Sequence, residues 1–370
     1  MTASRVATAS PAELAAIAGR FALPAAVVAV APLGNGNVNA TFEVHLADGR
    51  RVVLQRLNTA VFQQPALVMA NIRRVGEHVR GRLAAGGRHG HWQLPELLPT
   101  RDGTDALLLH DQVWRMLTFV EGAHCPDTID GPEQAHQLGL GLGTFHGLIH
   151  DLPAHELADT LEGFHITPRY LERFDAVAAA PARALCPEAE RCCAFVADRR
   201  ELAPVLEQAR AAGRLLPRPI HGDPKVTNVM LDRESGRAVA LIDLDTVKPG
   251  LLHYDIGDCL RSGANPAGED TTDLEAVHFD LDLAGAILRG YLAAAGEVLS
   301  PADHDHLYDA IRLLPFELGL RFLTDHLEGD VYFRSSRPGH NLDRARVQFR
   351  LTESIEAQEG EIRALLEALR

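Results

Sequence analysis

The chain has 370 residues, of which 46% are hydrophobic, and its formal net charge is −14 at pH 7. This length suits two lobes, and this composition supports a core and argues against a chain that is disordered throughout. The strong negative charge disfavours nucleic acid and anionic lipid as partners. Because no apolar run approaches about 18 residues, we expect no membrane-spanning segment.

The cysteines and the first residues bear on the compartment. The five cysteines are odd in number and form no Cys-x-x-Cys pair, which argues against a disulfide framework or a zinc ribbon and fits a reducing environment. Residues 1–10 lack the long apolar core of a signal peptide. We therefore expect a cytoplasmic protein.

The first third of the chain predicts a small lobe rich in β-strands. A short helix capped by Ser10 is expected from Pro11 to Phe21. Strands are expected at residues 27–30, 41–46 and 51–54, with a hairpin turn at 47–50, and again at 94–98, 106–109 and 113–120. Hydrophobic residues at three- and four-residue steps after Pro65 predict a helix between the two groups of strands. We expect residues 1–121 to form this antiparallel lobe.

The remainder predicts a larger lobe made mainly of helices. Helices are expected at residues 132–150, 169–180, 190–212, 273–295, 301–329 and 343–369, and a strand pair is expected around 229–243. The predicted fold class is therefore α+β, with residues 122–370 as the second lobe.

Residues 221–228 and 242–245 carry the most informative pattern in the chain. Asp223 is followed five residues later by Asn228, and Asp243 and Asp245 close a short apolar run. These oxygen-bearing side chains suit Mg²⁺ and a phosphate chain, and protein kinases use the same layout. Three carboxylates in one cleft would repel each other, so the cluster makes physical sense chiefly around a divalent cation. A Gly-Asp-Pro triplet alone is most often a surface turn, and the full spacing favours a site.

Asp223 is the candidate that accepts the proton of an acceptor hydroxyl. An aspartate with a pKa of about 3.9 is ionised at neutral pH. Pro224 disfavours helical dihedrals at Asp223, and Gly222 can adopt dihedrals forbidden to other residues, so we expect a turn here. His221 is expected to bond the loop backbone. Lys225 is either a phosphate contact or a solvated cation.

These residues resemble the aminoglycoside phosphotransferase and choline kinase-like family, whose loop has the form His-Gly/Asn-Asp-x4-Asn and is followed by Ile-Asp-x-Asp. The resemblance implies a bilobal protein-kinase-like fold, with a nucleotide-binding first lobe and the catalytic, metal and acceptor sites in the second. It implies that ATP is the phosphate donor, that Asp223 is the catalytic base, and that Asn228 and Asp243 bind Mg²⁺.

The nucleotide site departs from the family pattern in two ways. The loop Gly34-Asn35-Gly36-x-x-Asn39, expected under the phosphates, lacks a third glycine. The strand that usually carries a phosphate-binding lysine reads Val-Leu-Gln-Arg at 53–56, so Arg56 is a candidate substitute. The candidate nucleotide-binding residues are Gly34, Asn35, Gly36, Asn39, Arg56 and Lys225.

A narrower resemblance, to the N-acetylhexosamine 1-kinases, extends in patches over residues 33–360. It is carried by residues 34–39, 54–58, 243–250, 254–258 and 319–333. It implies that Asn37, Arg321 and Tyr332, with Asp223, lie near the sugar, although related sugar kinases often carry His where Asn37 stands. Alternatively, Arg321 and Asp325 simply pair on a helix surface.

The pattern and the resemblance together predict an ATP- and Mg²⁺-dependent kinase. The predicted acceptor is a sugar or amino sugar, and the predicted target is the anomeric hydroxyl of an N-acetylhexosamine. Two alternatives remain open. One is a kinase for an aminoglycoside or a choline-type amine. The other is a catalytically silent nucleotide-binding protein, which the missing lysine motivates. The oligomeric state is not predicted.

Overall fold

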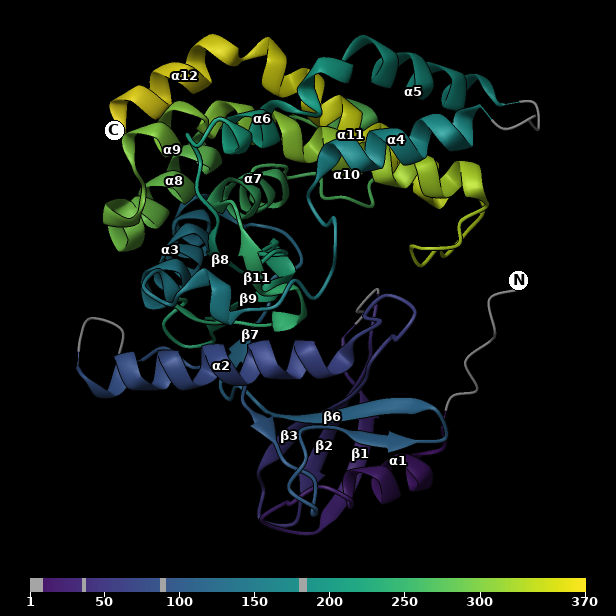
Figure 1. Ribbon diagram of the computed structural model, residues 1–370, viewed down its shortest axis with the longest axis vertical. Helices are drawn as coiled ribbons and strands as arrows, with labels where there is room; N and C mark the ends of the chain where they lie inside the picture. Colours follow the sequence, from purple (N-terminus) through teal and green to yellow (C-terminus); the bar gives the residue numbers. More distant parts are fainter. Residues whose placement is uncertain (1–8, 35–37, 87–90, 180–184) are drawn as a thin grey trace.

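The computed structural model describes residues 9–34, 38–86, 91–179 and 185–370. These residues form a small lobe built on an antiparallel sheet and a larger lobe built mainly of helices (Figure 1). The predicted α+β class and its division into a β-rich and a helical part are confirmed. We retain 1–121 and 122–370 as the proposed domains.

The small lobe is a six-stranded antiparallel sheet with strand order β1-β2-β3-β6-β4 and with β5 paired to β6. Its strands are β1 (Val27–Pro32), β2 (Ala40–Leu46), β3 (Arg51–Arg56), β4 (Leu97–Leu98), β5 (Leu107–Leu109) and β6 (Gln112–Thr118). Helix α1 (Pro11–Ala18), which Ser10 and Glu13 cap, packs with Leu54, Trp114 and Met116 in the core of this lobe. The opposite face of β3 and β6 carries Gln55 and Arg115 and contacts the large lobe, since Arg115 pairs with Asp245.

Helix α2 (Pro65–Ala84) lies in sequence between strands β3 and β4 of the sheet but belongs by packing to the other core. Its apolar side chains, among them Ile72 and Val75, join the hydrophobic cluster of the large lobe. Buried Asn71 fixes the helix by donating to the carbonyls of Ala158 and Val247, each at 2.8 Å, and by accepting from the Ala158 N–H. Figure 1 shows α2 running between the sheet and the helical lobe.

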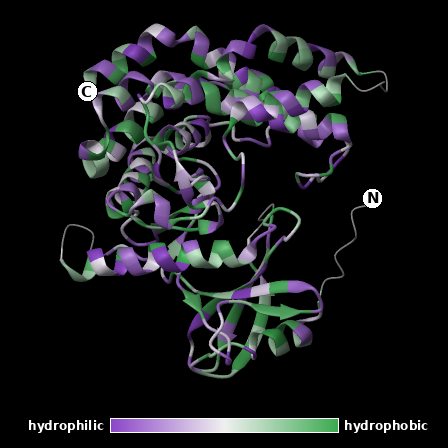
Figure 2. Ribbon diagram, viewed as in Figure 1, coloured by the Kyte–Doolittle hydropathy of each residue, from purple (hydrophilic) through white to green (hydrophobic). Residues whose placement is uncertain are grey.

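The large lobe contains most of the helices. They are α3 (Gly131–Ile149), α4 (Thr167–Ala178), α5 (Pro187–Asp198), α6 (Val205–Ala211), α7 (Leu252–Gly263), α8 (Leu281–Ala295), α9 (Pro301–Asp305), α10 (Leu307–Glu328), α11 (His340–Ala357) and α12 (Glu359–Ala368). Helices α3 and α8 cross in close contact, since a Cβ on Gly139 would lie 1.8 Å from the Ile287 carbonyl oxygen. The coloured ribbon shows hydrophobic and hydrophilic residues alternating along these helices (Figure 2).

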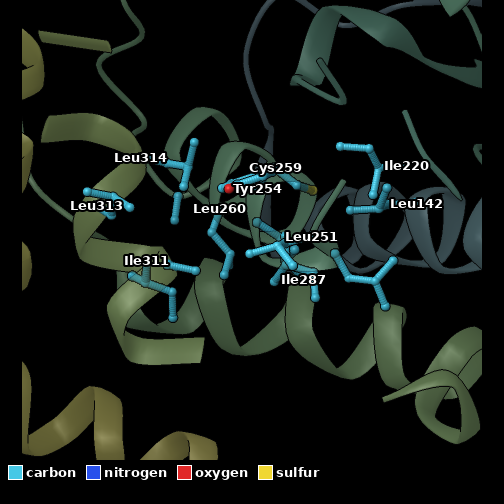
Figure 3. Close-up of a cluster of buried hydrophobic side chains, with 14 of the residues drawn as sticks. Leu142, Ile220, Leu251, Tyr254, Cys259, Leu260, Ile287, Ile311, Leu313 and Leu314 are labelled. Carbon is cyan, nitrogen blue, oxygen red and sulfur yellow. The ribbon is translucent and has the colours of Figure 1, made fainter. Parts of the chain in front are cut away.

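Short strands in the large lobe carry the acidic motifs. Strand β9 (Val229–Asp232) pairs with β10 (Ala238–Leu241) and with β7 (Ala123–His124), and β8 (Arg218–Ile220) pairs with β11 (Lys248–Gly250). The core beneath them is continuous: Leu142 of α3, Ile220 of β8, Leu251 just before α7, and Ile287 of α8 are all buried and lie together in Figure 3. This packing gives the loops between the strands a rigid base.

The structure corrects several predicted boundaries. Residues 190–212 form two helices, α5 and α6, and Pro204 stands immediately before the second. Residues 273–280 form a short 3-10 turn and a loop ahead of α8, and the helices expected at 301–329 and 343–369 are each divided in two. Helix α7 was not predicted; its sequence is rich in Asp and Gly, but eleven of its twelve residues are buried, so tertiary packing overrides propensity.

Among the residues that the structure describes, no helix combines the length and the apolar character needed to cross a membrane.

Candidate active site

Residues 221–228, here called the acidic loop, leave strand β8 and end in a short 3-10 turn before β9. Gly222 has a φ of +89°, and a Cβ there would lie 2.7 Å from the Thr246 carbonyl oxygen. Only glycine meets both requirements without strain. The predicted turn at this position is therefore present, and it brings the loop against residues 244–246.

Asp255 of α7 holds the start of the acidic loop through the backbone. Its Oδ2 accepts from the N–H of His221 at 2.6 Å and its Oδ1 from the N–H of Gly222 at 2.8 Å. His146 of α3 donates to the same carboxylate at 2.8 Å and accepts from Tyr291. Burial raises the pKa of Asp255, but these bonds outweigh burial and lower it overall. The start of the acidic loop is thus held by hydrogen bonds to a buried carboxylate that stays ionised.

His221 joins the two acidic segments. Its Nε2 donates to the Ile242 carbonyl at 2.9 Å, and its Nδ1 accepts from the Asp223 N–H at 3.2 Å. One nitrogen donates and the other accepts, which requires the neutral ring, and burial lowers the pKa of His221 in agreement. His221 therefore bonds the loop backbone, as expected from the sequence.

Asp223, Lys225 and Asn228 meet within the loop. Lys225 Nζ lies 2.5 Å from Asp223 Oδ2, and Asn228 Nδ2 donates to the Asp223 carbonyl at 2.7 Å and to its Oδ2 at 3.1 Å. Burial raises the pKa of Asp223, but Lys225 overrides it and the net pKa is lowered. Because the amide nitrogen of Asn228 is engaged, its amide oxygen is the atom left to face a metal ion.

Asp243 follows β10 in the left-handed conformation, with φ 65° and ψ 57°. Surrounding protein and the nearby charges of Asp245 and Asp223 raise the pKa of its carboxyl to about 7, against the opposing effect of Lys225 and Arg115. The side chain itself remains exposed, so solvent and ions reach it and screen part of this effect. Asp243 thus lies among the charges of the acidic loop.

The oxygen set suits Mg²⁺ bound jointly with phosphate. Asn228 offers a neutral oxygen and Asp243 a charged one, both hard ligands. No group of three His, Cys, Asp or Glu side chains in the described part of the chain is arranged to hold a metal ion alone. Mg²⁺ usually takes one or two carboxylates and completes its shell with water and substrate phosphates, so the residues present fit that ion.

Asp245 does not stand free beside Asp243 and Asp223. It is buried and pairs with Arg115 of β6, whose Nη2 lies 2.5 Å from Asp245 Oδ1. Asn39, at the end of the glycine loop, donates to Asp245 Oδ2 at 2.6 Å. The expected repulsion among three carboxylates is thus reduced by a cation and an amide from the other lobe.

The candidate nucleotide residues of the small lobe are placed in part. Gly34 has a φ of +68°. Asn35, Gly36 and Asn37 lie outside the described residues. Arg56 lies on the same face of β3 as buried Leu54, and its guanidinium is 5.8 Å from the ring of Trp114, whereas Gln55 lies on the opposite face. Arg56 therefore points away from the face on which Gln55 and Arg115 meet Asp245.

A pocket of about 210 Å³ opens in the large lobe. Its lining comes from the segment before α4, from α4, from the end of α10 and from the loop after it: Leu161, Glu162, Phe164, Tyr170, Arg173, Arg321, Thr324, Asp325, Glu328, Tyr332 and Phe333. Arg321 and Tyr332, two of the predicted acceptor residues, therefore share one pocket.

Arg321 is enclosed by aromatic rings. Its guanidinium carbon lies 5.1 Å from the ring centres of Phe164 and Tyr170 and 5.3 Å from that of Phe333. Asp325, one turn further along α10, accepts from the N–H groups of Val331, Tyr332 and Phe333. The surface pair that the spacing allowed is thus not formed, and Asp325 instead shapes the loop that carries Tyr332.

His165 connects this pocket to the acidic loop. Its Nε2 donates to the Gly222 carbonyl and its Nδ1 to Glu317 of α10, each at 2.8 Å. Two acceptors require both ring nitrogens to carry protons; burial opposes this charge, but Glu317 raises the pKa of His165 overall. Glu317 stands one helical turn before Arg321, so the pocket wall and the loop form one bonded unit.

Sequence reasoning missed Arg115, Asp255, His146 and His165. A charged residue between Trp114 and Met116 was the one visible signal, since a lone arginine in an apolar strand needs a partner. The other three act through contacts between segments far apart in sequence. Asp255 lies within residues 254–258, which carry the narrower resemblance, but nothing local reveals the groups that it holds.

The model of the phosphotransferase enzyme family (APH) matches residues 29–297. Among solved structures, the chain is similar to an aminoglycoside phosphotransferase from Alicyclobacillus acidocaldarius subsp. acidocaldarius DSM 446, with 18% identity over 99% of both chains and a TM-score of 0.59.

Two other kinases share the fold. The chain is 16% identical to a microcompartment-associated aminopropanol kinase over 94% of this chain and 98% of that one, with a TM-score of 0.64. It is 14% identical to the amicoumacin kinase hAmiN in complex with AMP-PNP, Ca²⁺ and Ami, over 92% of both chains, with a TM-score of 0.59.

Proposed function

Because this chain belongs to the phosphotransferase enzyme family and is a small-molecule kinase, we propose that it transfers a phosphoryl group from ATP to a sugar. The proposed target is the anomeric hydroxyl of an N-acetylhexosamine, with Mg²⁺ as the metal ion. A hemiacetal hydroxyl is more acidic than an ordinary alcohol, which lowers the demand on the base that receives its proton.

Each residue of the acidic loop has a separate role in the proposed reaction. Asp223 orients the acceptor hydroxyl and takes its proton, since it is ionised and held on a fixed turn. Lys225 balances charge between Asp223 and the transferred phosphate. Asn228 and Asp243 would hold Mg²⁺, which supplies neutralisation of the phosphate oxygens. Gly34 and Asn39 border the proposed phosphate loop.

The observation that carries the acceptor class is Arg321. The guanidinium of Arg321 already occupies the space among the aromatic side chains of Phe164, Tyr170 and Phe333. A quaternary ammonium group would need this aromatic cage for itself. The charge of Arg321 repels a second cation. Planar N–H groups suit the hydroxyl and carbonyl oxygens of an N-acetylated sugar instead.

The acidic residues of the pocket support the same choice. Glu162 pairs with Arg169 at 3.1 Å, and Glu328 pairs with Arg173 at 2.5 Å. Asp325 accepts from backbone N–H groups. Each carboxylate in the described lining of the pocket thus already has a partner within the chain, so the amine of a choline-type or aminoglycoside acceptor would have to compete with that partner.

Tyr332 completes the proposed acceptor site. It lines the pocket and is 40% exposed, so its hydroxyl can meet a sugar that enters from solvent. We propose that Asn37 also contacts the sugar.

An acceptor screen tests the proposal. ADP release is measured with equal concentrations of N-acetylglucosamine, N-acetylgalactosamine, glucose, choline, ethanolamine and an aminoglycoside, and phosphorus NMR locates the phosphate on the product. We expect the N-acetylated sugars to be the best acceptors and the product to be a 1-phosphate. Faster turnover of an amine would refute the acceptor class.

The Arg321→Met variant tests whether acceptor binding depends on this pocket, as distinct from a general loss of folding or activity. We expect the KM for the sugar to rise by about 10- to 100-fold, the effect of losing charged hydrogen bonds, while the KM for ATP is unchanged. Arg312→Met is the matched control, since Arg312 lies on the same helix over Tyr308 and does not line the pocket. Nucleotide binding without turnover of any acceptor would instead favour the catalytically silent alternative.

A further inference from the structure

A row of three polar side chains crosses the face of the sheet that lies opposite the small-lobe core. Thr41 of β2 stands opposite Gln55 of β3, and Gln55 stands opposite Arg115 of β6. Gln55 Nε2 donates to Thr41 Oγ1 at 3.0 Å, and its Oε1 accepts from Arg115 Nε at 2.9 Å and from Nη2 at 2.7 Å. The row therefore fixes the guanidinium of Arg115 on this face of the sheet.

Arg115 also reaches the second lobe. Its Nη2 lies 2.5 Å from Asp245 Oδ1, and the two side chains are 1% and 2% exposed. Asn39 donates to the other oxygen of Asp245 and accepts from the N–H of Asn58 at 3.0 Å. One arginine thus lies where the sheet, the end of the glycine loop and the segment after Asp243 meet.

The guanidinium of Arg115 keeps one nitrogen without a partner. Among the described residues, Nη1 is buried and donates to no hydrogen-bond partner, although buried donors in proteins are almost always paired. Asp245, which Arg115 contacts, stands two residues after the proposed metal ligand Asp243. An unpaired donor at this place indicates a ligand that carries oxygen atoms.

We propose that Arg115 binds the phosphates of the nucleotide in place of a lysine on β3, with Gln55 and Asp245 as the residues that position it. This inference rests on the proposed use of ATP. An arginine suits such a relocation because its separate nitrogens can anchor to Gln55 and meet a phosphate oxygen at once, which the single ammonium of lysine does less well. The contact between Asn39, Asp245 and Arg115 is the one that an entering phosphate chain has to open.

Binding, not turnover, is the first readout. Calorimetry measures the Kd of ATP, ADP and adenosine for the wild-type chain and for Arg115→Met, with Mg²⁺ and with EDTA. We expect the Kd of ATP and ADP to rise by about 10- to 100-fold and that of adenosine to stay as in the wild type. Equal losses for ATP and adenosine, or no loss for ATP, would overturn the proposal.

Further variants separate a phosphate contact from a purely structural pair. Arg50→Met is the matched control, since Arg50 is an exposed arginine that pairs with Asp48 in the hairpin turn of the same sheet. Arg115→Met combined with Gln55→Lys returns a cation to β3, and we expect it to recover about half of the lost affinity for ATP. A phosphate-selective loss in Arg56→Met, with none in Arg115→Met, would assign the role to Arg56 instead.

The folding control is the melting temperature without ligand. If Arg115→Met does not fold, Arg115→Lys is used, and we expect a loss of affinity for ATP of about 3- to 10-fold with adenosine unchanged. Wild-type affinity for ATP in that folded variant would overturn the proposal. A chain that binds ATP through Arg115 but phosphorylates no sugar would contradict the proposed acceptor alone.

Discussion

Asp255→Asn tests how the acidic loop is held. The wild-type carboxylate accepts three hydrogen bonds, from the N–H groups of His221 and Gly222 and from His146. An asparagine of the same shape offers one acceptor oxygen and one NH₂ group. Whichever way the amide turns, an NH₂ group faces at least one N–H donor, so a buried donor loses its partner.

The size of the effect follows from these contacts. Losing one buried hydrogen bond to a charged group, with its donor left unpaired, costs about 3 kcal/mol. Unfolding entropy of roughly 2.1 cal/mol/K per residue converts this cost, for 370 residues, into a fall in Tm of about 4 °C. Because the same carboxylate places Gly222 and hence Asp223, we expect kcat to fall by at least about 10-fold as well.

Two assays and a control complete the test. Thermal unfolding without ligand gives the Tm, and ADP release at saturating ATP and acceptor gives kcat. Asp232→Asn is the control, because Asp232 caps an exposed turn between β9 and β10. A variant of Asp255 with wild-type Tm and wild-type kcat would show that the carboxylate does not hold the loop.

Three other predictions concern the acidic loop and its neighbours. Asp223→Asn should lower kcat by about 10²- to 10⁴-fold, measured by ADP release, with the Tm nearly unchanged. A proton on Asp243 competes with Mg²⁺, and the pKa of the Asp243 carboxyl is raised to about 7. The affinity for Mg²⁺, measured by calorimetry, should therefore rise from pH 6 to pH 8. An affinity that does not change with pH, or that is unchanged in Asp243→Ala, would contradict this. Gly222→Ala should lower the free energy of unfolding, measured with urea, by more than Gly213→Ala, since both have positive φ but only Gly222 meets a close neighbour.

The sequence predicts the parts of the fold whose periodicity is local. Alternation and turn residues locate the strands of the small lobe, and the repeat of Leu138, Leu142, Phe145 and Ile149 locates α3 within a residue at each end. Helix α7 fails the same reasoning, because Asp255 and Asp258 are buried by partners that lie elsewhere in the chain.

The residues of the candidate site likewise fall into those that the sequence predicts and those that it does not. Asp223, Lys225 and Asn228 lie close in sequence, so their spacing already predicts their meeting, and the structure brings them within bonding distance. The sequence could not assign a role in the site to Arg115. Its contact with Gln55 depends on strand register, and its contact with Asp245 depends on the approach of the two lobes. A lone arginine in an apolar strand shows that a partner is needed, but a single sequence does not identify that partner.

The residues that hold the proposed acceptor site and those that hold the proposed nucleotide site are positioned by different contacts. The acceptor side is bonded within the large lobe, since His165 ties Gly222 to Glu317, one helical turn before Arg321. The nucleotide side depends on contacts between lobes, which Asn39 and Arg115 make with Asp245. Motion of one lobe against the other would therefore disturb the nucleotide contacts while leaving the acceptor pocket and Asp223 in register. Acceptor preference and nucleotide affinity should then respond to separate sets of substitutions.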